Sequence, residues 1–340
     1  MRAIIFGGDC VLDLATVPDP TPGPGEVVLE IKASGMCGSD LHRYRSSHEA
    51  LGSPVVAGHE PCGVVVAIGP GVSSPLAYIG SRVMVHHYKG CSCCADCRSG
   101  WPQMCSTAPI LVYGTDADGS HAPYMKVFAS TLVKLDERLS FAAGAAISCG
   151  TGTAWGAFER MGLTGRDTLA VFGQGPVGLS ATLLAKAMGA RVIAIDIDQT
   201  RLNMASACGA DHVLNPVAGD VTEAIRAITN GMGATMALET SGTAPANRDA
   251  LTSVRPWGTV GLVGIGAELS FSLGKMLRRQ LRIVTSWTMS LPAQQTCAEF
   301  VVDRGIDLDV LFTDHWRLDQ AEEAYKKFNQ QSSGKGVFVM

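Results

Sequence analysis

The stretch Gly173-Gln174-Gly175-Pro176-Val177-Gly178 decides the fold of this chain. It follows the apolar run 167–172 and precedes the Ala-rich apolar segment 179–188, which ends at Gly189. This order predicts a strand, a tight glycine turn and a helix, the arrangement that binds the pyrophosphate of a dinucleotide. The alternative is a glycine-rich strand–helix turn that binds nothing.

Each glycine of the turn has a physical role. Gly173 permits the sharp bend, Gly175 lets the backbone approach a pyrophosphate, and Gly178 lets the helix pack closely on the strand. The start of the helix then presents unpaired N–H groups and the positive end of its dipole to the phosphates. The turn is therefore expected to bind the pyrophosphate of the dinucleotide.

An acidic residue identifies the expected dinucleotide. A second apolar run, 192–195, ends in Asp196, eighteen residues after Gly178. A carboxylate at this position accepts a hydrogen bond from a ribose 2′-OH and repels a 2′-phosphate. Residues 197–200 contain no arginine, although Arg201 lies close in the sequence. We therefore expect NAD rather than NADP.

Composition limits the possible classes of protein. The chain has 340 residues, of which 46% are hydrophobic and 17% charged, and its net charge is −4. The length predicts two domains, and the charge makes nucleic acid or an anionic membrane an unexpected partner. The first residues predict a strand rather than a signal peptide, and no apolar run is long enough to span a bilayer. Eleven cysteines, five of them clustered within residues 91–105, favour metal sites in a reducing cytoplasm over disulfides.

The first cluster of metal-ligating residue types is 37–42 (Cys-Gly-Ser-Asp-Leu-His) together with 58–60 (Gly-His-Glu). Taken alone, Cys37 could be a small buried apolar residue and His59 a core histidine. Together, with Asp40 and Glu60 available to orient or join the ligands, they predict a zinc site.

The second cluster is denser. Cys91, Cys94, Cys97 and Cys105 have the spacing C-x2-C-x2-C-x7-C. Four thiolates close a tetrahedral zinc site and leave no position for substrate, so this zinc is expected to be structural. Cys93 breaks the spacing and is left out of the ligand set. His86 and His87, just upstream, are interpreted as residues that end a strand.

Short strand patterns separated by Gly and Pro fill the first part of the chain and predict a β-rich domain. From about 153 to 287, strand and helix patterns alternate, which predicts a parallel sheet with helices on both faces. Beyond it, 292–303 and 318–329 are predicted as helices and 336–340 as a closing strand. The predicted fold class is therefore α/β.

This order of motifs resembles the zinc-dependent medium-chain dehydrogenase/reductase family, which includes the alcohol and polyol dehydrogenases, over essentially the whole chain. The resemblance implies a GroES-like β-rich catalytic domain at 1–152, a doubly wound Rossmann domain that binds NAD at 153–287, and a return to the catalytic domain at 288–340. It also implies two zinc ions, one catalytic and one structural.

The resemblance assigns roles to the first cluster. Cys37, His59 and a third ligand, for which Cys149 is the candidate, would hold the catalytic zinc. Many polyol dehydrogenases have a glutamate as third ligand, and two roles stay open for Glu60: to approach the metal or only to face it. Ser39 would bond the substrate oxygen, His42 would pass the proton outward, and Asp40 would orient His59.

Family contacts with NAD extend beyond the glycine turn and Asp196. By resemblance they fall on Thr153, Val177, Arg201, Ser241, Gly242, Gly264, Ile265, Ser286 and Trp287. The family often has a basic side chain near the last strand, where this sequence places Phe338.

The implied activity is hydride transfer between NAD and a secondary alcohol or polyol, giving an aldehyde or ketone, by a homodimer or homotetramer. Two alternatives stay open: a zinc-free quinone or enoyl reductase, and an NAD-binding sensor without turnover.

Overall fold

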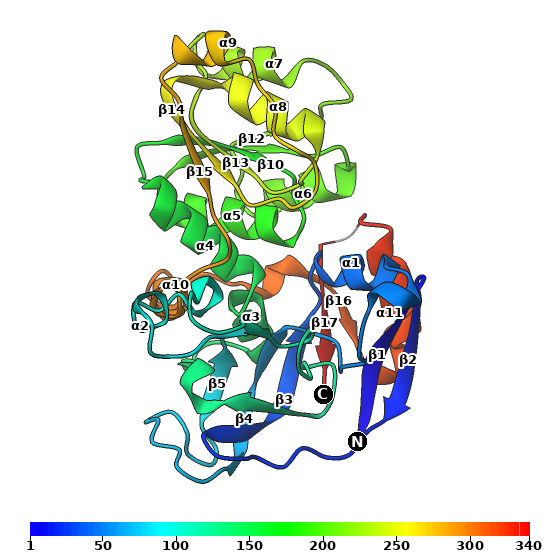
Figure 1. The fold of residues 1–340 in the computed structure, drawn as a ribbon. Coiled ribbons are helices and arrows are strands. Elements are labelled where there is room, and N and C mark those ends of the chain that lie inside the picture. The colour runs from blue at the N-terminus through cyan, green and yellow to red at the C-terminus, as the bar shows by residue number, and fades with distance from the viewer. Residues whose placement is uncertain (333) are drawn as a thin grey trace. The chain divides into compact units, whose positions relative to one another are not determined.

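The computed structural model describes residues 1–332 and 334–340, which form two compact units (Figure 1). The first unit contains Met1–Gly152, Ser290–Gln331 and Lys335–Met340, and the second is built on Thr153–Met289. The first unit therefore takes its residues from both ends of the chain.

The second unit contains a six-stranded parallel sheet with the order β12-β11-β10-β13-β14-β15. Its strands are β10 (Thr168–Phe172), β11 (Arg191–Ile195), β12 (His212–Leu214), β13 (Ala234–Glu239), β14 (Val254–Leu262) and β15 (Arg282–Thr285). The middle of β10 is wholly buried, as in a parallel sheet covered on both faces. The chain order reverses between β10 and β13, so the carboxyl ends of these two strands border the expected ligand crevice.

Helices connect these strands (Figure 1). They are α5 (Pro176–Ala187), α6 (Gln199–Ala207), α7 (Val221–Ile228), α8 (Ala244–Ser253) and α9 (Leu273–Leu277), while α4 (Gly150–Met161) precedes β10. Asp198 and Asp220 cap α6 and α7 by accepting backbone hydrogen bonds. In contrast, α5 starts from Gly175 with Pro176 in its first turn and has no side-chain cap. The sequence thus leaves the first N–H groups of α5 available to a ligand.

The first unit contains a seven-stranded sheet in which β16-β17-β3-β4-β5-β9 form the path and β8 pairs with β3. Its strands are β3 (Glu26–Gly35), β4 (Glu60–Ile68), β5 (Arg82–Val85), β8 (Tyr124–Phe128), β9 (Leu132–Lys134), β16 (Phe312–Trp316) and β17 (Lys335–Val339). Two smaller sheets pair β1 (Arg2–Gly8) with β2 (Val11–Thr16) and β6 (Tyr88–Lys89) with β7 (Leu111–Val112). Because β17 pairs with β3, the start of the last strand lies beside the segment that follows Gly35.

Five helices accompany this sheet. They are α1 (Asp40–Arg45), α2 (Ala95–Arg98), α3 (Phe141–Ile147), α10 (Leu291–Asp303) and α11 (Ala321–Asn329). Short 3-10 turns are η1 (His48–Ala50), η2 (Pro102–Met104), η3 (Ala129–Thr131), η4 (Asp309–Leu311) and η5 (Leu318–Gln320). Tyr325 and Phe328 of α11 are buried in one apolar cluster with Phe6, Tyr44 and Phe338. This cluster attaches the C-terminal helix to the start of the chain.

The predicted α/β class with a doubly wound sheet is confirmed. The helix predicted over 318–329 is divided into η5 and α11. The helix α4 was not predicted, because Gly150, Gly152 and Gly156 lower helix propensity. Its burial explains why it forms: Cβ on Gly156 would lie 2.5 Å from the Thr288 carbonyl oxygen, so the glycine is needed for close packing.

Among residues 1–332 and 334–340, we find no helix whose length and apolar character would let it cross a membrane.

Replacing Gly178 by Ala should destabilise the second unit. A Cβ at this position would lie 1.8 Å from the Gly173 carbonyl oxygen, a backbone atom that cannot rotate away. We expect a loss of about 1–3 kcal/mol in the free energy of unfolding, measured by chemical denaturation. Gly175→Ala is the matched control, because its Cβ would meet nothing within 4 Å and its φ of −72° suits alanine. Equal stabilities of the two variants would contradict the close packing of helix on strand.

Candidate active site

Two thiols, an imidazole and a carboxylate meet in the first unit. Cys37, His59, Glu60 and Cys149 each offer one ligand atom, and these atoms lie within 4.8 Å of one another. Cys37 follows β3, His59 and Glu60 lie at the start of β4, and Cys149 lies between α3 and α4. Pairing of Gly35 with Glu60 across β3 and β4 brings the first two segments together. The set has the donor chemistry of a zinc site.

The carboxylate of Asp40 connects two members of this group. Its Oδ1 lies 2.9 Å from Nδ1 of His59, and its Oδ2 accepts a 2.8 Å hydrogen bond from the backbone N–H of Cys37. Because Nδ1 of His59 is engaged by a carboxylate, Nε2 is left to face the thiols and bind a metal. The structure therefore places Asp40 where an orienting residue is needed.

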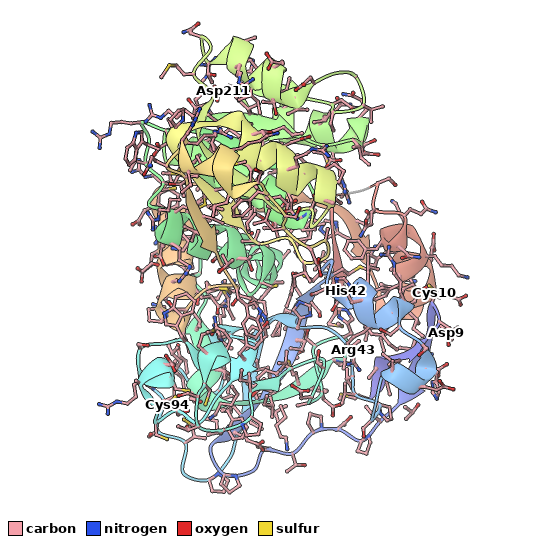
Figure 2. All side chains as sticks on the ribbon, turned by 45° about the horizontal axis from the view of Figure 1, so that its top comes forward. Asp9, Cys10, His42, Arg43, Cys94 and Asp211 are labelled. Atoms are coloured by element: carbon pink, nitrogen blue, oxygen red, sulfur yellow. The ribbon has the colours of Figure 1, made fainter. Side chains whose placement is uncertain are left out.

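Ser39 lies directly at the group. Its Oγ is 3.2 Å from Nε2 of His59 and 3.2 Å from Sγ of Cys37. His42, on α1 and labelled in Figure 2, is exposed, and no side-chain hydrogen bond links it to Ser39. The structure thus brings Ser39 to the ligands and leaves His42 on the solvent side of the same short helix.

Glu60 is fully buried, and a basic residue explains how this is tolerated. Lys335, at the start of β17 and also buried, pairs with Oε2 of Glu60 and donates a 3.2 Å hydrogen bond to the Met36 carbonyl oxygen. The other oxygen, Oε1, has no hydrogen-bond donor among the described residues. Burial raises the pKa of Glu60 to about 8, although Lys335 opposes this effect. A buried carboxylate with an oxygen within 4.8 Å of two thiol sulfurs and an imidazole nitrogen is a place for a cation.

The last strand carries one buried basic residue. The sequence placed Phe338 where the family often has a basic contact with the cofactor. Lys335, three positions earlier, is basic but is buried and paired with Glu60. Phe338 instead packs in the core, its ring 4.7 Å from that of His121. The signal that could have identified Lys335 is its position at the start of an otherwise apolar closing strand.

The two thiols of the group interact with each other. Sγ of Cys37 lies 3.8 Å from Sγ of Cys149, and both side chains are buried. A hydrogen bond from Cys149 lowers the pKa of Cys37 well below its ordinary value, and the same contact raises the pKa of Cys149. Negative charge is therefore concentrated on a sulfur beside His59, which suits a divalent metal.

A chain of hydrogen bonds lies behind Asp40. Tyr325 of α11 donates from its hydroxyl to Oδ2 of Asp40 at 3.4 Å, and the hydroxyl oxygen of Tyr325 lies 2.7 Å from Nε2 of His121. Nδ1 of His121 lies 2.7 Å from Oγ of Ser34, which lies 2.6 Å from Oγ of Ser120. These five residues are buried.

The donor-to-acceptor direction of these hydrogen bonds follows from the Asp40 carboxylate, which can only accept. Because Tyr325 donates to the carboxylate, its oxygen must accept the Nε2–H of His121. Burial lowers the pKa of His121 to about 4, so the ring is neutral and its Nδ1 accepts from the Ser34 hydroxyl. The donors therefore all point toward Asp40 and hold its Oδ2, while its Oδ1 contacts His59. None of Tyr325, His121 or Ser34 was predicted from the sequence.

A second histidine lies near the group. His87, which follows β5, is buried, with its ring centre 5.1 Å from that of His59. Its Nδ1 lies 3.0 Å from the carbonyl oxygen of Ser148, so Nδ1 carries a proton. The sequence predicted that His86 and His87 end a strand, and they do follow β5, which ends at Val85. It did not predict that His87 lies close to the ligands.

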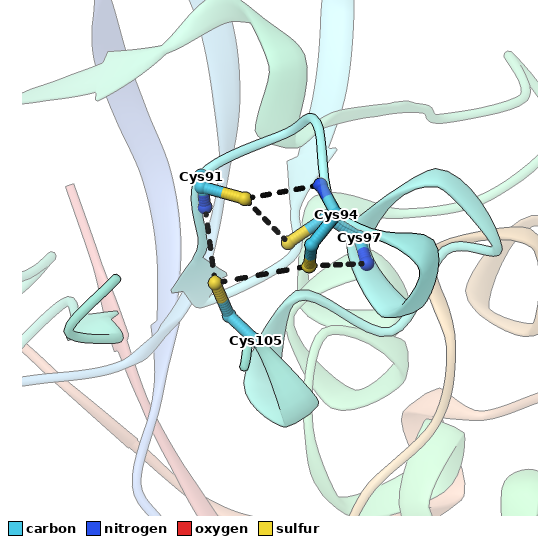
Figure 3. A group of neighbouring side chains, drawn as sticks. All are labelled: Cys91, Cys94, Cys97 and Cys105. Atoms are coloured by element: carbon cyan, nitrogen blue, oxygen red, sulfur yellow. Dashed lines mark hydrogen bonds between the residues drawn. The ribbon is translucent and has the colours of Figure 1, made fainter. Parts of the chain in front are cut away.

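The second metal group consists of four half-buried thiols (Figure 3). The Sγ atoms of Cys91, Cys94, Cys97 and Cys105 lie within 4.8 Å of one another. The Cys91–Cys97 and Cys94–Cys105 pairs are 3.9 and 4.0 Å apart. Sulfurs about 2.3 Å from a shared tetrahedral zinc are about 3.8 Å apart, so these spacings fit one ion.

Local backbone shapes this lobe. Sγ of Cys94 caps α2 by accepting the backbone N–H of Cys97 at 3.5 Å. Cβ on Gly90 would lie 2.5 Å from Sγ of Cys97, so only glycine leaves room for that sulfur. The spacing of the four cysteines is thus converted into a tetrahedral arrangement by one short helix and one glycine.

In the second unit, the predicted cofactor residues gather at the carboxyl ends of the parallel strands. Gly173 follows β10 and has a φ of +89°, which glycine adopts without strain. Cβ on Gly173 would lie 2.9 Å from Oγ1 of Thr240, whereas Cβ on Gly175 would meet nothing within 4 Å. Gly175 and the uncapped start of α5, which includes Val177, therefore border open space where a pyrophosphate fits.

Asp196 follows β11 and is buried beside the turn. Its Oδ2 accepts a 2.6 Å hydrogen bond from the backbone N–H of Gln174, and its Oδ1 accepts one from Asp198 at 2.9 Å. Nη1 of Arg201 lies 4.0 Å from Oδ2. The carboxylate has further lone pairs available for a ribose hydroxyl.

The remaining predicted contacts follow three other elements. Ser241 and Gly242 follow β13, where both donate backbone N–H groups to the buried carboxylate of Glu239. Gly264 and Ile265 follow β14, and Cβ on Gly264 would lie 2.2 Å from the Gly242 nitrogen, so these two loops are in close contact. Ser286 and Trp287 follow β15, and Oγ of Ser286 is buried without a hydrogen-bond partner among the described residues. Thr153 lies on α4 and is buried.

Two family models match the chain. A model described as zinc-binding dehydrogenase matches residues 176–304, and one described as alcohol dehydrogenase GroES-like domain matches residues 23–137. The first covers most of the dinucleotide unit and the second includes Cys37, His59 and the four-cysteine lobe.

Curated relatives and solved structures agree with these matches. An uncharacterized zinc-type alcohol dehydrogenase-like protein, YphC, of Escherichia coli (strain K12) is 36% identical over 99% of this chain and 98% of its own length. A sorbitol dehydrogenase of Halalkalibacterium halodurans is 30% identical over 95% of this chain and 93% of its own. A crystal structure of the short chain alcohol dehydrogenase rspB from E. coli CFT073, complexed with NADH, superposes with a TM-score of 0.89 at 27% identity, covering 100% and 99% of the two chains.

Tyr325→Phe should weaken metal binding at the Cys37–His59 group while leaving the packing of α11 intact. The hydroxyl that fixes Asp40 is lost, and Asp40 orients His59. We expect the affinity for cobalt(II) or zinc to fall about 3- to 10-fold, less than the roughly 10- to 100-fold typical when a residue touching a ligand is removed. Competition with a chelator measures the affinity.

Tyr44→Phe is the matched control. Tyr44 belongs to the same buried aromatic cluster, with its ring centre 5.4 Å from that of Tyr325. Its hydroxyl is not part of the series of hydrogen bonds that reaches Asp40. Equal metal affinities of the two variants would show that the hydrogen bonds behind Asp40 do not act on the metal group.

Proposed function

The chain belongs to the zinc-dependent medium-chain dehydrogenase/reductase family, and on that premise we propose that it transfers a hydride between NAD and a secondary alcohol or polyol, giving an aldehyde or ketone. The observation that carries this proposal is the group of four ligand atoms within 4.8 Å in the first unit, with the Ser39 hydroxyl beside it. A zinc-free reductase would have no reason to bury two thiols, a histidine and a carboxylate together.

The residues of the first group fit zinc. Cys37 and Cys149 supply sulfurs, and His59 offers Nε2 because Asp40 holds its Nδ1. Glu60 offers the unpaired Oε1 as a further ligand or as a counter-charge. A zinc ion held by these side chains supplies Lewis-acid polarisation of an alcohol or carbonyl oxygen.

Ser39 is the residue that would handle the substrate proton. Its hydroxyl lies at the ligands on one side and at the start of α1 on the other. It can therefore accept the proton of an alcohol while it is oxidised and return it while a ketone is reduced. His42, exposed one turn along α1, would receive that proton by way of the cofactor ribose and exchange it with solvent. Asp40 would keep the imidazole of His59 fixed throughout.

The four-cysteine group would hold the second, structural zinc. Cys91, Cys94, Cys97 and Cys105 provide four sulfurs at tetrahedral spacing, so no ligand position is left for a substrate. Its contribution would be to stability, since this lobe has few buried apolar residues of its own.

NAD would supply the hydride acceptor or donor. Support comes from the open space at Gly175, from the Asp196 carboxylate at the end of β11, and from the NADH complex of a relative with the same fold. We accordingly assign NAD binding to 153–287 and catalysis to 1–152 with 288–340. The relatives include a sorbitol dehydrogenase, which supports a polyol or another secondary alcohol as the substrate class.

We also propose that the protein is a homodimer or homotetramer in the cytoplasm. The strand β15 lies at the edge of its sheet, and an exposed edge favours pairing with another chain. Apolar side chains near this edge are exposed, namely Leu273 and Leu277 of α9 and Ile283 of β15. A second copy that covers them would remove this surface from water.

NAD reduction across a panel of alcohols, polyols and amino alcohols, with a zinc count on the same sample, tests the function. We expect turnover and about two zinc ions per chain. Cys37→Ala should abolish turnover and lower the count by about one while the protein stays folded. No metal would favour a quinone or enoyl reductase, and zinc without turnover would favour a sensor.

Asp196→Ser should shift the cofactor preference toward NADP. Removing the carboxylate eliminates the repulsion of a 2′-phosphate and frees Arg201, whose Nη1 lies 4.0 Å from it, to bind that phosphate. We expect the ratio of kcat/KM for NADP to that for NAD to rise about tenfold or more, because a charge-assisted hydrogen bond contributes roughly 1.5–3 kcal/mol. Adding Arg201→Ala should cancel most of the gain. An unchanged ratio would show that Asp196 does not determine the preference for NAD over NADP.

A further inference from the structure

The lobe that contains the four-thiol group has a fifth cysteine. Sγ of Cys93 lies 3.4 Å from Sγ of Cys91, closer than the two ligand pairs at 3.9 and 4.0 Å. Four sulfurs already complete a tetrahedron, whose edges are about 3.8 Å. Cys93 is therefore a thiol in contact with one corner of the metal group rather than a ligand.

Backbone geometry holds these two sulfurs together. Ser92, between them, has a φ of +65°, a left-handed conformation that is uncommon for serine. With the chain bent in this way, both the backbone N–H and the thiol of Cys93 face Sγ of Cys91, each at 3.4 Å. The contact is thus built into the turn and does not depend on a flexible side chain alone.

The Cys91 sulfur is also the best hydrogen-bonded member of the group. It accepts from Oγ1 of Thr107 at 3.0 Å and from the backbone N–H of Cys94 at 3.2 Å, in addition to Cys93. These donors stabilise negative charge on Cys91 and fix its position. Cys93, in contrast, is exposed to solvent. A reagent from solution reaches Cys93 first, and the neighbouring nucleophile is Cys91.

We propose that Cys93 is an oxidation site for peroxides and that Cys91 is its partner in a disulfide. The proposal rests on the structural zinc site proposed above. Hydrogen peroxide transfers one oxygen to Cys93, forming a sulfenic acid and releasing water. The Cys91 thiolate then attacks the sulfenic sulfur, a sulfur–sulfur bond forms, and hydroxide leaves. In sum, one thiol, one thiolate and one peroxide give a disulfide, one water and one hydroxide, and the two sulfurs supply both electrons.

The product removes one ligand from the metal group. Cys91 in a disulfide is no longer a thiolate, so only Cys94, Cys97 and Cys105 remain to hold zinc. Metal affinity falls with the loss of a thiolate, and the zinc is released. Oxidation at an exposed position would in this way loosen the lobe without touching Cys37 or Cys149, which belong to the other group.

The test uses the zinc-loaded full chain and hydrogen peroxide at low molar excess. Zinc release is followed with a chromogenic chelator, and the disulfide is located by fragmentation of the peptide that contains residues 90–98. We expect the unmodified protein to form the Cys91–Cys93 bond and to release about one zinc per chain from this lobe. Cys93→Ser should release it about tenfold more slowly, because the adjacent sulfur is missing.

Cys10→Ser is the control, since Cys10 is an exposed thiol in the turn between β1 and β2, far from the four-cysteine lobe (Figure 2). It should behave like the unmodified protein. Cys37 and Cys149 are present in all three proteins, so any zinc lost from their group is common to them. Equal release from the unmodified protein and Cys93→Ser, or a disulfide that joins Cys91 to another cysteine, would overturn the proposal.

The structural site itself is tested separately. If the purified chain holds no zinc at the four-cysteine group, that site is contradicted by the metal count, whereas the fragmentation data still decide whether Cys93 pairs with Cys91.

Discussion

Burying two thiols, an imidazole and a carboxylate within 4.8 Å of one another is the constraint on which the structure depends. Charged and polar groups in a protein interior are costly unless they are paired or hold a metal. The surrounding residues pair the imidazole and one oxygen of the carboxylate, and the two thiols contact each other. Asp40 engages His59 from one side, Lys335 engages Glu60 from another, and the Cys91 lobe is separate. The arrangement makes sense as a metal centre and is difficult to explain as an ordinary core.

The two metal groups differ in the way their expected roles require. The Cys37 group is buried, mixes sulfur, nitrogen and oxygen, and has the Ser39 hydroxyl beside it. The Cys91 group is half-buried, contains only sulfur, and is organised by one short helix and Gly90. A mixed set with a polar neighbour suits chemistry, while a closed set of four thiolates suits a structural staple. In the second unit, Asp196, Gly173 and Ser241 likewise come together because they follow the carboxyl ends of three adjacent strands, β11, β10 and β13.

Sequence reasoning was effective where spacing carries the information. The glycine turn, Asp196 and both cysteine clusters have local patterns with a direct physical meaning, and the predicted fold class follows from the alternation of strand and helix patterns over about 153–287. It missed residues whose meaning depends on pairing between distant segments. Lys335 reaches Glu60 because β17 pairs with β3, and Tyr325 reaches Asp40 because α11 packs on the start of the chain. His121 is distant in sequence from Tyr325 and Asp40. The helix α4 was not predicted because its glycines have low helix propensity, and the helix is stabilised by packing instead.

X-ray absorption at the zinc edge on the purified, untagged protein tests the central claim most directly, because it counts the ligands of the bound metal. One site of four sulfurs and one of two sulfurs with two lighter atoms give an average of about three sulfurs at about 2.3 Å and one nitrogen or oxygen at about 2.0 Å per zinc. The account predicts this mixed shell. A shell of sulfur alone would contradict a metal at Cys37, His59 and Cys149, and a shell without sulfur would contradict both sites.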